Sequence, residues 1–144
     1  MKLLHRILQT DRDKTTILIR GIVGYVLVTE GIQKFLYSDA LGVGRFLKMG
    51  IPNAEFMAPF VGSCEILFGS FIMIGFPIRM ATIPQIIIML TALVTTKLPV
   101  LSEKGVLTFS HEARADLLML FGLVLLLVKG SEAFSVDSRI MERA

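Results

Sequence analysis

Residues 54–75 read AEFMAPFVGSCEILFGSFIMIG, an apolar run whose middle is interrupted by a single carboxylate, Glu65. An α-helix rises about 1.5 Å per residue, so a run of this length crosses the hydrocarbon core of a bilayer, which is about 30 Å thick. Lipid offers no hydrogen-bond partner to the backbone, and the run lacks the alternation that marks a membrane strand. We therefore expect residues 54–75 to form a membrane-spanning helix.

Three further apolar runs, residues 16–36, 78–98 and 113–129, have comparable length. The chain has 144 residues, of which 53% are hydrophobic and 19% are charged, and its mean hydropathy is +0.71. Soluble domains typically contain about 25% charged residues. Four spans leave little chain for a soluble catalytic domain. The sequence therefore predicts one all-α domain, residues 1–144, folded as an integral membrane four-helix bundle.

Two segments outside these runs also carry apolar residues at helical spacing. In residues 1–15 they lie beside Lys2 and Arg6, which predicts a short N-terminal interfacial helix. A signal peptide is the alternative interpretation, because residues 38–40 have the small-x-small pattern of a cleavage site. In residues 37–53, the first outer loop, the pattern predicts an interfacial or re-entrant half-helix, with an ordinary loop as the alternative.

The distribution of Lys and Arg predicts the orientation of the bundle. If both termini are cytoplasmic, eight Lys and Arg residues lie on the cytoplasmic side of the membrane and five lie on the outer side. Cytoplasmic loops carry the excess of Lys and Arg in membrane proteins. We therefore expect both termini, together with Arg79, on the cytoplasmic side.

Ionisable residues inside the spans are costly, and they are therefore informative. At 100° per residue, Arg20, Glu30 and Lys34 share one face of the first helix, and Glu65 shares a face with small residues of the second. We expect an Arg20–Glu65 pair and a Glu30–Lys34 pair, with Asp116 and Lys97 near the latter at the outer mouth. One interpretation is that these pairs only fix the helix register. The functional alternative is a polar pocket for a quinone-like or lipid-like ligand, or a carboxylate that shares a proton.

The sequence lacks the residues that hold common redox groups. It has one cysteine, Cys64, and two histidines, His5 and His111, which the predicted topology places on opposite sides of the bilayer. Haem held by two histidines needs both at membrane depth, and iron–sulfur clusters need several cysteines. The net charge of +3 includes no dense basic run, which argues against nucleic-acid binding. We therefore expect no metal and no intrinsic cofactor, and any electrons would travel in a bound quinone or a partner protein.

Several short strings together resemble the DoxX family. They are residues 18–20 and 31–35 (GIQKF), 50–52 (GIP), Glu65 with Gly69 and Gly75, Arg79 with Ala81, Glu112, Gly130 and 135–137. The resemblance implies a four-helix membrane bundle without bound haem. The family is named with subunits of archaeal quinone-linked sulfur oxidation, and other members are associated with a bacterial membrane complex that handles oxidative stress. By resemblance, Arg20, Lys34, Glu65 and Arg79 are the positions expected to matter. The chain departs from the family pattern at Glu30, at residues 129–132 and in a shorter loop at residues 99–110.

These observations favour a quinone-interacting accessory subunit of a membrane oxidoreductase complex, with the ligand between the helices around Arg20, Glu65 and Gln85. The alternatives are a non-enzymatic scaffold that binds lipid or a partner membrane protein, and a small transporter. The expected location is the inner (plasma) membrane of a prokaryote. The expected partners are the lipid bilayer, a redox partner subunit and a second copy of the chain. No catalytic residue is assigned. The residues expected to bind a ligand or form a buried polar cluster are Arg20, Glu30, Lys34, Glu65, Arg79, Gln85 and Asp116.

Overall fold

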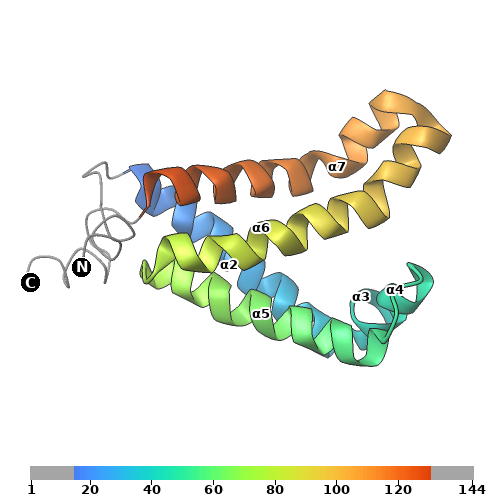
Figure 1. Cartoon of the computed structure of the whole chain (residues 1–144), viewed down its shortest axis with the longest axis horizontal. Coiled ribbons are helices and arrows are strands. Elements are labelled where there is room, and N and C mark those ends of the chain that lie inside the picture. The colour runs from blue at the N-terminus through green and yellow to red at the C-terminus, as the bar shows by residue number, and fades with distance from the viewer. Residues whose placement is uncertain (1–14, 131–144) are drawn as a thin grey trace, which may run out of the picture.

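The structure is a computed structural model that describes residues 15–130, and within them it contains helices and no strand. The long helices are α2 (Thr15–Leu36), α5 (Ala54–Ile74), α6 (Ile78–Ala92) and α7 (Leu98–Lys129) (Figure 1). A π-helical turn, η1 (Leu93–Lys97), joins α6 to α7 without a break. The predicted N-terminal interfacial helix, residues 1–15, lies outside the described residues except for its last position. The predicted all-α fold is confirmed.

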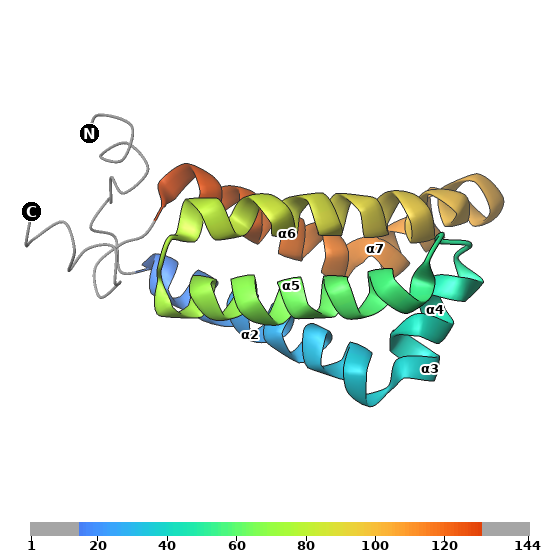
Figure 2. The same cartoon turned by 60° about the horizontal axis from the view of Figure 1, so that its bottom comes forward.

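Helix α7 reverses direction at Gly105, where φ is 81° and ψ is 175°. A positive φ is accessible to glycine without a steric penalty. The reversal divides residues 78–129 into two antiparallel arms, so the described residues form four long helical arms. These arms make a ring of contacts in the order α2, α5, α6 and α7, and α7 returns to α2 (Figures 1 and 2).

Three helical stretches in residues 15–130 are long and apolar enough to cross a membrane: Thr16–Leu36, Ala54–Ile74 and Ile78–Lys129. The third has 52 residues. At 1.5 Å per residue it would extend about 80 Å as a straight helix, more than twice the thickness of a bilayer core. Because it doubles back at Gly105, each of its two arms is about as long as a bilayer core is thick. The predicted spans 78–98 and 113–129 both lie within this hairpin.

The segment between those two predicted spans is helical, apart from Gly105. The sequence predicts a loop over residues 99–110, between the third and fourth apolar runs. That interpretation is wrong. Polar residues end a hydrophobic run but do not end a helix, so both arms continue past the apolar segments.

Helices α2 and α5 approach closely along two pairs of glycines. A Cβ atom added to Gly24 would lie 2.7 Å from the carbonyl oxygen of Gly69, and one added to Gly31 would lie 2.6 Å from that of Gly62. Small residues at matching positions let the backbones of membrane helices touch. The contacts fix an antiparallel register in which Gly24 faces Gly69 and Gly31 faces Gly62.

The segment between α2 and α5 contains two short helices, α3 (Ser38–Leu41) and α4 (Val43–Lys48), in place of the single half-helix that the sequence predicts. Phe46 of α4 is 8% exposed and packs against Ala54 and Ala58 at the start of α5. The alternative of an ordinary loop is therefore wrong. We call the end of the bundle with α3, α4 and the Gly105 reversal the cap end, and the opposite end, where residues 15 and 130 lie, the terminal end (Figure 1).

Besides the small cluster around Phe46 at the cap end, the larger hydrophobic core occupies the terminal half of the bundle. Its fully buried side chains come from all four arms: Leu27, Ile72, Ile78, Leu123 and Leu126. Along α6 the last buried residue is Gln85, and no residue between positions 86 and 112 is buried. We call the part around the core the closed half and the part beyond Gln85 the open half. In the open half, the α6–α7 hairpin diverges from α2 and α5 (Figure 1).

Candidate polar site in the open half

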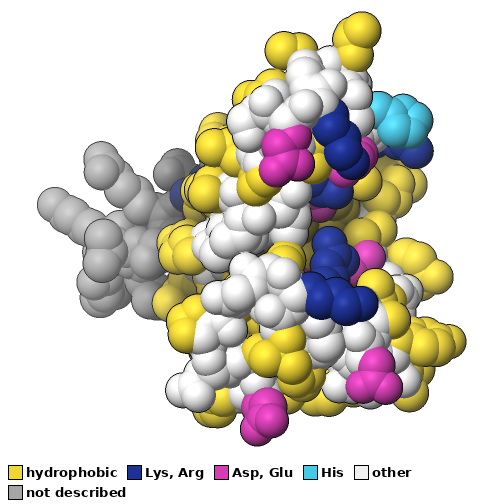
Figure 3. All heavy atoms as spheres, turned by 90° about the vertical axis from the view of Figure 1, so that its right-hand side faces the viewer, with side chains coloured by type: hydrophobic (Ala, Val, Ile, Leu, Met, Phe, Trp, Pro, Cys, Tyr) yellow, Lys and Arg dark blue, Asp and Glu magenta, His cyan; other side chains and the backbone are white. Residues whose placement is uncertain are grey.

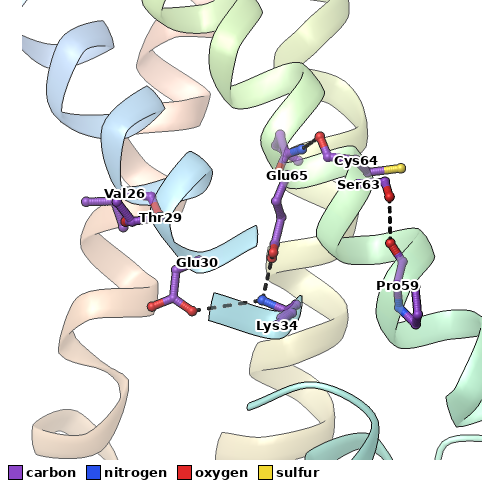
Figure 4. Close-up of polar contacts among 9 residues, drawn as sticks. Val26, Thr29, Glu30, Lys34, Pro59, Ser63, Cys64 and Glu65 are labelled. Carbon is purple, nitrogen blue, oxygen red and sulfur yellow. Dashed lines mark hydrogen bonds and ion pairs between the residues drawn. The ribbon is translucent and has the colours of Figure 1, made fainter. Parts of the chain in front are cut away.

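The main polar feature of the bundle is an ion pair between α2 and α5. The Lys34 Nζ atom lies 2.7 Å from the Glu65 Oε2 atom, and their side chains are only 12% and 7% exposed (Figure 4). Lys34 also lies 3.9 Å from the Glu30 carboxylate, whose side chain is 49% exposed. The predicted Glu30–Lys34 pair is confirmed. The three groups therefore form a row that runs from the surface into the bundle.

The predicted Arg20–Glu65 pair is wrong, because the partner of Glu65 is Lys34. Gly24 faces Gly69, and Arg20 lies one helical turn from Gly24 toward the terminal end. In this register Arg20 is about 12 Å along the bundle axis from Glu65. Helical side chains lean toward the N-terminus of their own helix. In this antiparallel pair, Lys34 and Glu65 lean toward each other, whereas Arg20 leans away. Arg20 is 5% exposed in the closed half and has a polar interaction of its own.

Gln85 links α6 to α5 beside this ion pair. Its side chain is completely buried, and its Nε2 atom donates a hydrogen bond of 2.9 Å to the carbonyl oxygen of Cys64, the residue before Glu65. Its Oε1 atom is buried and accepts no hydrogen bond within the described residues. Gln85 is the last buried residue of α6, so it marks the boundary between the closed and open halves, which we call the floor of the open half.

Arg79 lies away from this cluster, near the start of α6. One of its guanidinium nitrogens donates hydrogen bonds to the carbonyl oxygens of Val128 and Lys129, at 3.1 and 3.5 Å. These are carbonyls of the last turn of α7, which have no partner within their own helix. A cation there also interacts favourably with the helix dipole. Arg79 therefore caps α7 at the terminal end.

Asp116 is half-buried on α7, on the same helical face as the buried residues Ala113 and Leu123. Within residues 15–130 no ion pair joins Asp116 or Lys97 to the Glu30–Lys34 pair, so the predicted outer cluster is only partly assembled. The sequence analysis missed the pair between Lys104 and Glu112, 3.8 Å apart, which connects the two arms of the hairpin near Gly105.

At the cap end, charged side chains gather between the lobe formed by α3 and α4 and the lobe formed by the hairpin (Figure 3). The α4 helix, which carries Arg45, packs against α5, the helix that carries Glu65. In residues 15–130, no group of three or more His, Cys, Asp or Glu side chains could hold a metal ion. The arrangement can instead bind the polar head of an amphiphile whose apolar part lies along the hairpin.

The fold and the buried ionic groups define a helical integral membrane protein. The family model for DoxX matches residues 15–98, and the chain belongs to this family. An uncharacterized membrane protein, Rv3486 of Mycobacterium tuberculosis, is 43% identical over 145 residues, which cover 96% of this chain and 89% of the relative. No solved structure matches the chain. The resemblance to DoxX seen in the sequence is thereby confirmed.

Proposed function

We propose that this protein is a quinone-interacting accessory subunit of a membrane oxidoreductase complex, with its ligand site in the open half. The observation that carries the proposal is the buried Lys34–Glu65 pair at the point where the bundle opens. Ionisable residues inside membrane helices are rare and tend to mark functional sites. The site differs from the one expected from sequence, since Lys34 takes the place assigned to Arg20.

The residues around the open half suit a ring with a polar head and an apolar tail. Lys34 can donate a hydrogen bond to an oxygen of the head group. Ile86 and Met89 of α6 and Met119 of α7 are partly buried apolar side chains beside the core, and they can contact the ring. Ligand sites are typically apolar clefts with a few polar groups that fix the orientation. A bound quinone would supply the electron-carrying chemistry, while the chain would bind and orient it.

The test is the quinone content of the protein purified in mild detergent from its native membrane. We expect the wild type to retain quinone well above the proportion found in the bulk membrane lipid. The double variant Lys34→Met/Glu65→Gln removes both charges and should lose this excess. Lys48→Met removes an exposed cation of α4 and serves as the matched control, which should keep it. A wild-type protein whose quinone content equals that of the bulk lipid would refute the proposal.

A non-enzymatic scaffold is the second candidate, and one observation favours it. The Lys34–Glu65 pair and the two glycine contacts connect the same two helices, as expected if the ion pair serves only to hold α2 against α5. A scaffold predicts a constant membrane partner in pull-downs, no enriched quinone, and partner binding that survives Lys34→Met/Glu65→Gln.

A further inference from the structure

Hydrogen-bond acceptors outnumber available donors at the floor of the open half. The Gln85 Nε2 donor is taken by the carbonyl oxygen of Cys64. The Lys34 ammonium group lies between two carboxylates, at 2.7 Å from Glu65 and 3.9 Å from Glu30. Carboxylates only accept hydrogen bonds, and each oxygen can accept more than one. A molecule that binds here therefore meets oxygen atoms more often than free N–H groups.

The Gln85 Oε1 atom is the clearest of these acceptors. It is buried, and no donor within the described residues reaches it. A buried acceptor without a partner destabilises the protein, because the hydrogen bond it made to water in the unfolded chain is not replaced. A ligand that brings a donor to this oxygen relieves that penalty.

The Gln85 amide is completely buried, so a ligand reaches it from the open half when a neighbouring side chain moves aside. Beyond Gln85 on the same face of α6, one turn further on, lies Met89, which is only partly buried. Methionine is unbranched and flexible, so it adapts to an entering group. Met89 is therefore the side chain next to Gln85 on the route along α6 from the open half.

Asp116 adds a carboxylate on the opposite arm. It is half-buried on the inward face of α7 and has no ion partner within the described residues. Its presence increases the excess of acceptors that a ligand in the open half would face.

We infer that the site takes a head group that donates hydrogen bonds, a quinol, in preference to the corresponding quinone. The inference rests on the proposed function and specifies which form of the ligand is held. A quinone carries two carbonyl acceptors and no donor, so neither of its oxygens can donate a hydrogen bond to the Gln85 Oε1 atom. A quinol hydroxyl can donate to the Gln85 Oε1 atom. The inference concerns binding alone and involves no electron transfer.

The test compares three probes with the same decyl tail on the purified full-length protein in lipid nanodiscs without oxygen. The probes are a benzoquinone, its quinol, and the dimethyl ether of that quinol, which keeps the ring but lacks both O–H donors. Bound probe is counted by mass spectrometry after gel filtration, with empty nanodiscs as the baseline for partition into lipid. We expect the quinol to bind about tenfold more tightly than either of the others.

The outcomes separate the inference from the proposed function. If the quinone or the dimethyl ether binds as well as the quinol, the inference is overturned while the proposed function stands. If no probe exceeds the empty-nanodisc baseline, the proposed function fails and the inference with it. Gln85→Met removes the acceptor at similar side-chain length and should bring quinol binding down to the level of the quinone. Should that variant not fold, the comparison of the three probes on the wild type decides alone.

Discussion

The α2–α5 pair and the α6–α7 hairpin pack around one core at the terminal end and diverge at the cap end (Figure 1). On α6 the inward face is buried at Ile78 and Ala81, whereas Ala92 and Thr96, further along the same face, are only half-buried. On α2 the inward face carries Val23 and Leu27 beside the core and then Lys34, which is paired with Glu65. Burial of charge without a partner is costly, and both buried cations of α2, Arg20 in the closed half and Lys34 in the open half, have a polar interaction. The two halves therefore differ in how closely the α6–α7 hairpin packs on α2 and α5, more than in whether polar side chains are buried.

The largest expected effect comes from the glycine contacts that hold α2 against α5. Gly31→Ala places a methyl group 2.6 Å from the carbonyl oxygen of Gly62, so the two backbones must separate. We expect a loss of about 2–4 kcal/mol in the free energy of unfolding, measured by denaturation in detergent. Gly21→Ala on the same helix is the matched control, because its new methyl group has no atom within 4 Å. Equal losses for the two variants would contradict the register.

The next effect concerns the ion pair at the boundary between the halves. Glu65→Leu leaves the Lys34 ammonium group buried without its partner, and we expect a loss of about 3 kcal/mol of unfolding free energy. The double variant Lys34→Met/Glu65→Leu removes both charges and should recover most of that loss. The single variant Lys34→Met completes the comparison. If the double variant loses as much unfolding free energy as Glu65→Leu and Lys34→Met lose together, the two residues do not interact.

The cap of α7 in the closed half should have a smaller effect. Arg79→Met removes the hydrogen bonds to the carbonyl oxygens of Val128 and Lys129, and we expect a loss of about 1 kcal/mol. The measurement is thermal unfolding in detergent. Arg79→Lys keeps the charge and should restore part of the loss. An unchanged melting temperature for Arg79→Met would show that the cap contributes nothing.

The smallest effect should come from the hairpin in the open half. The Lys104–Glu112 pair is long, at 3.8 Å, and its side chains are largely solvent-accessible. Solvent and salt screen such pairs, so Glu112→Gln should change the unfolding free energy by less than about 0.5 kcal/mol. A loss as large as that of Arg79→Met would mean that the hairpin is held more tightly than its exposure indicates.

The sequence predicts the fold well because lipid restricts the chain so strongly. Four apolar runs with no competing soluble segment can form little except a helical bundle, and the face containing Gly62 and Gly69 correctly marks a close contact. The chain reversal at Gly105 and the helical structure of residues 99–110 are harder to predict from sequence. Nothing in local polarity distinguishes a loop from a helix that continues into water, so the positions where the arms end depend on the tertiary structure.

The ion pair was the main failure at the site. Depth counted from each helix end suggested Arg20 as the partner of Glu65, but that count ignored the direction in which helical side chains lean. The glycine spacing contained the missing information, since pairing Gly24 with Gly69 and Gly31 with Gly62 brings Lys34 to Glu65. The unpartnered oxygen of Gln85 could not be predicted, because it depends on which backbone carbonyl the amide reaches.

The most direct test of the contrast between the two halves is the reactivity of two cysteines on one face of α6. In a Cys64→Ala background, Ala81→Cys lies in the closed half, where Ala81 is 1% exposed, and Ala92→Cys lies three turns away in the open half, where Ala92 is half-buried. The structure predicts that N-ethylmaleimide modifies the cysteine at position 92 at least about tenfold faster in detergent solution, because thiol reactivity follows access. Equally slow modification at both positions would mean that the bundle is closed along its whole length and that the open half does not exist.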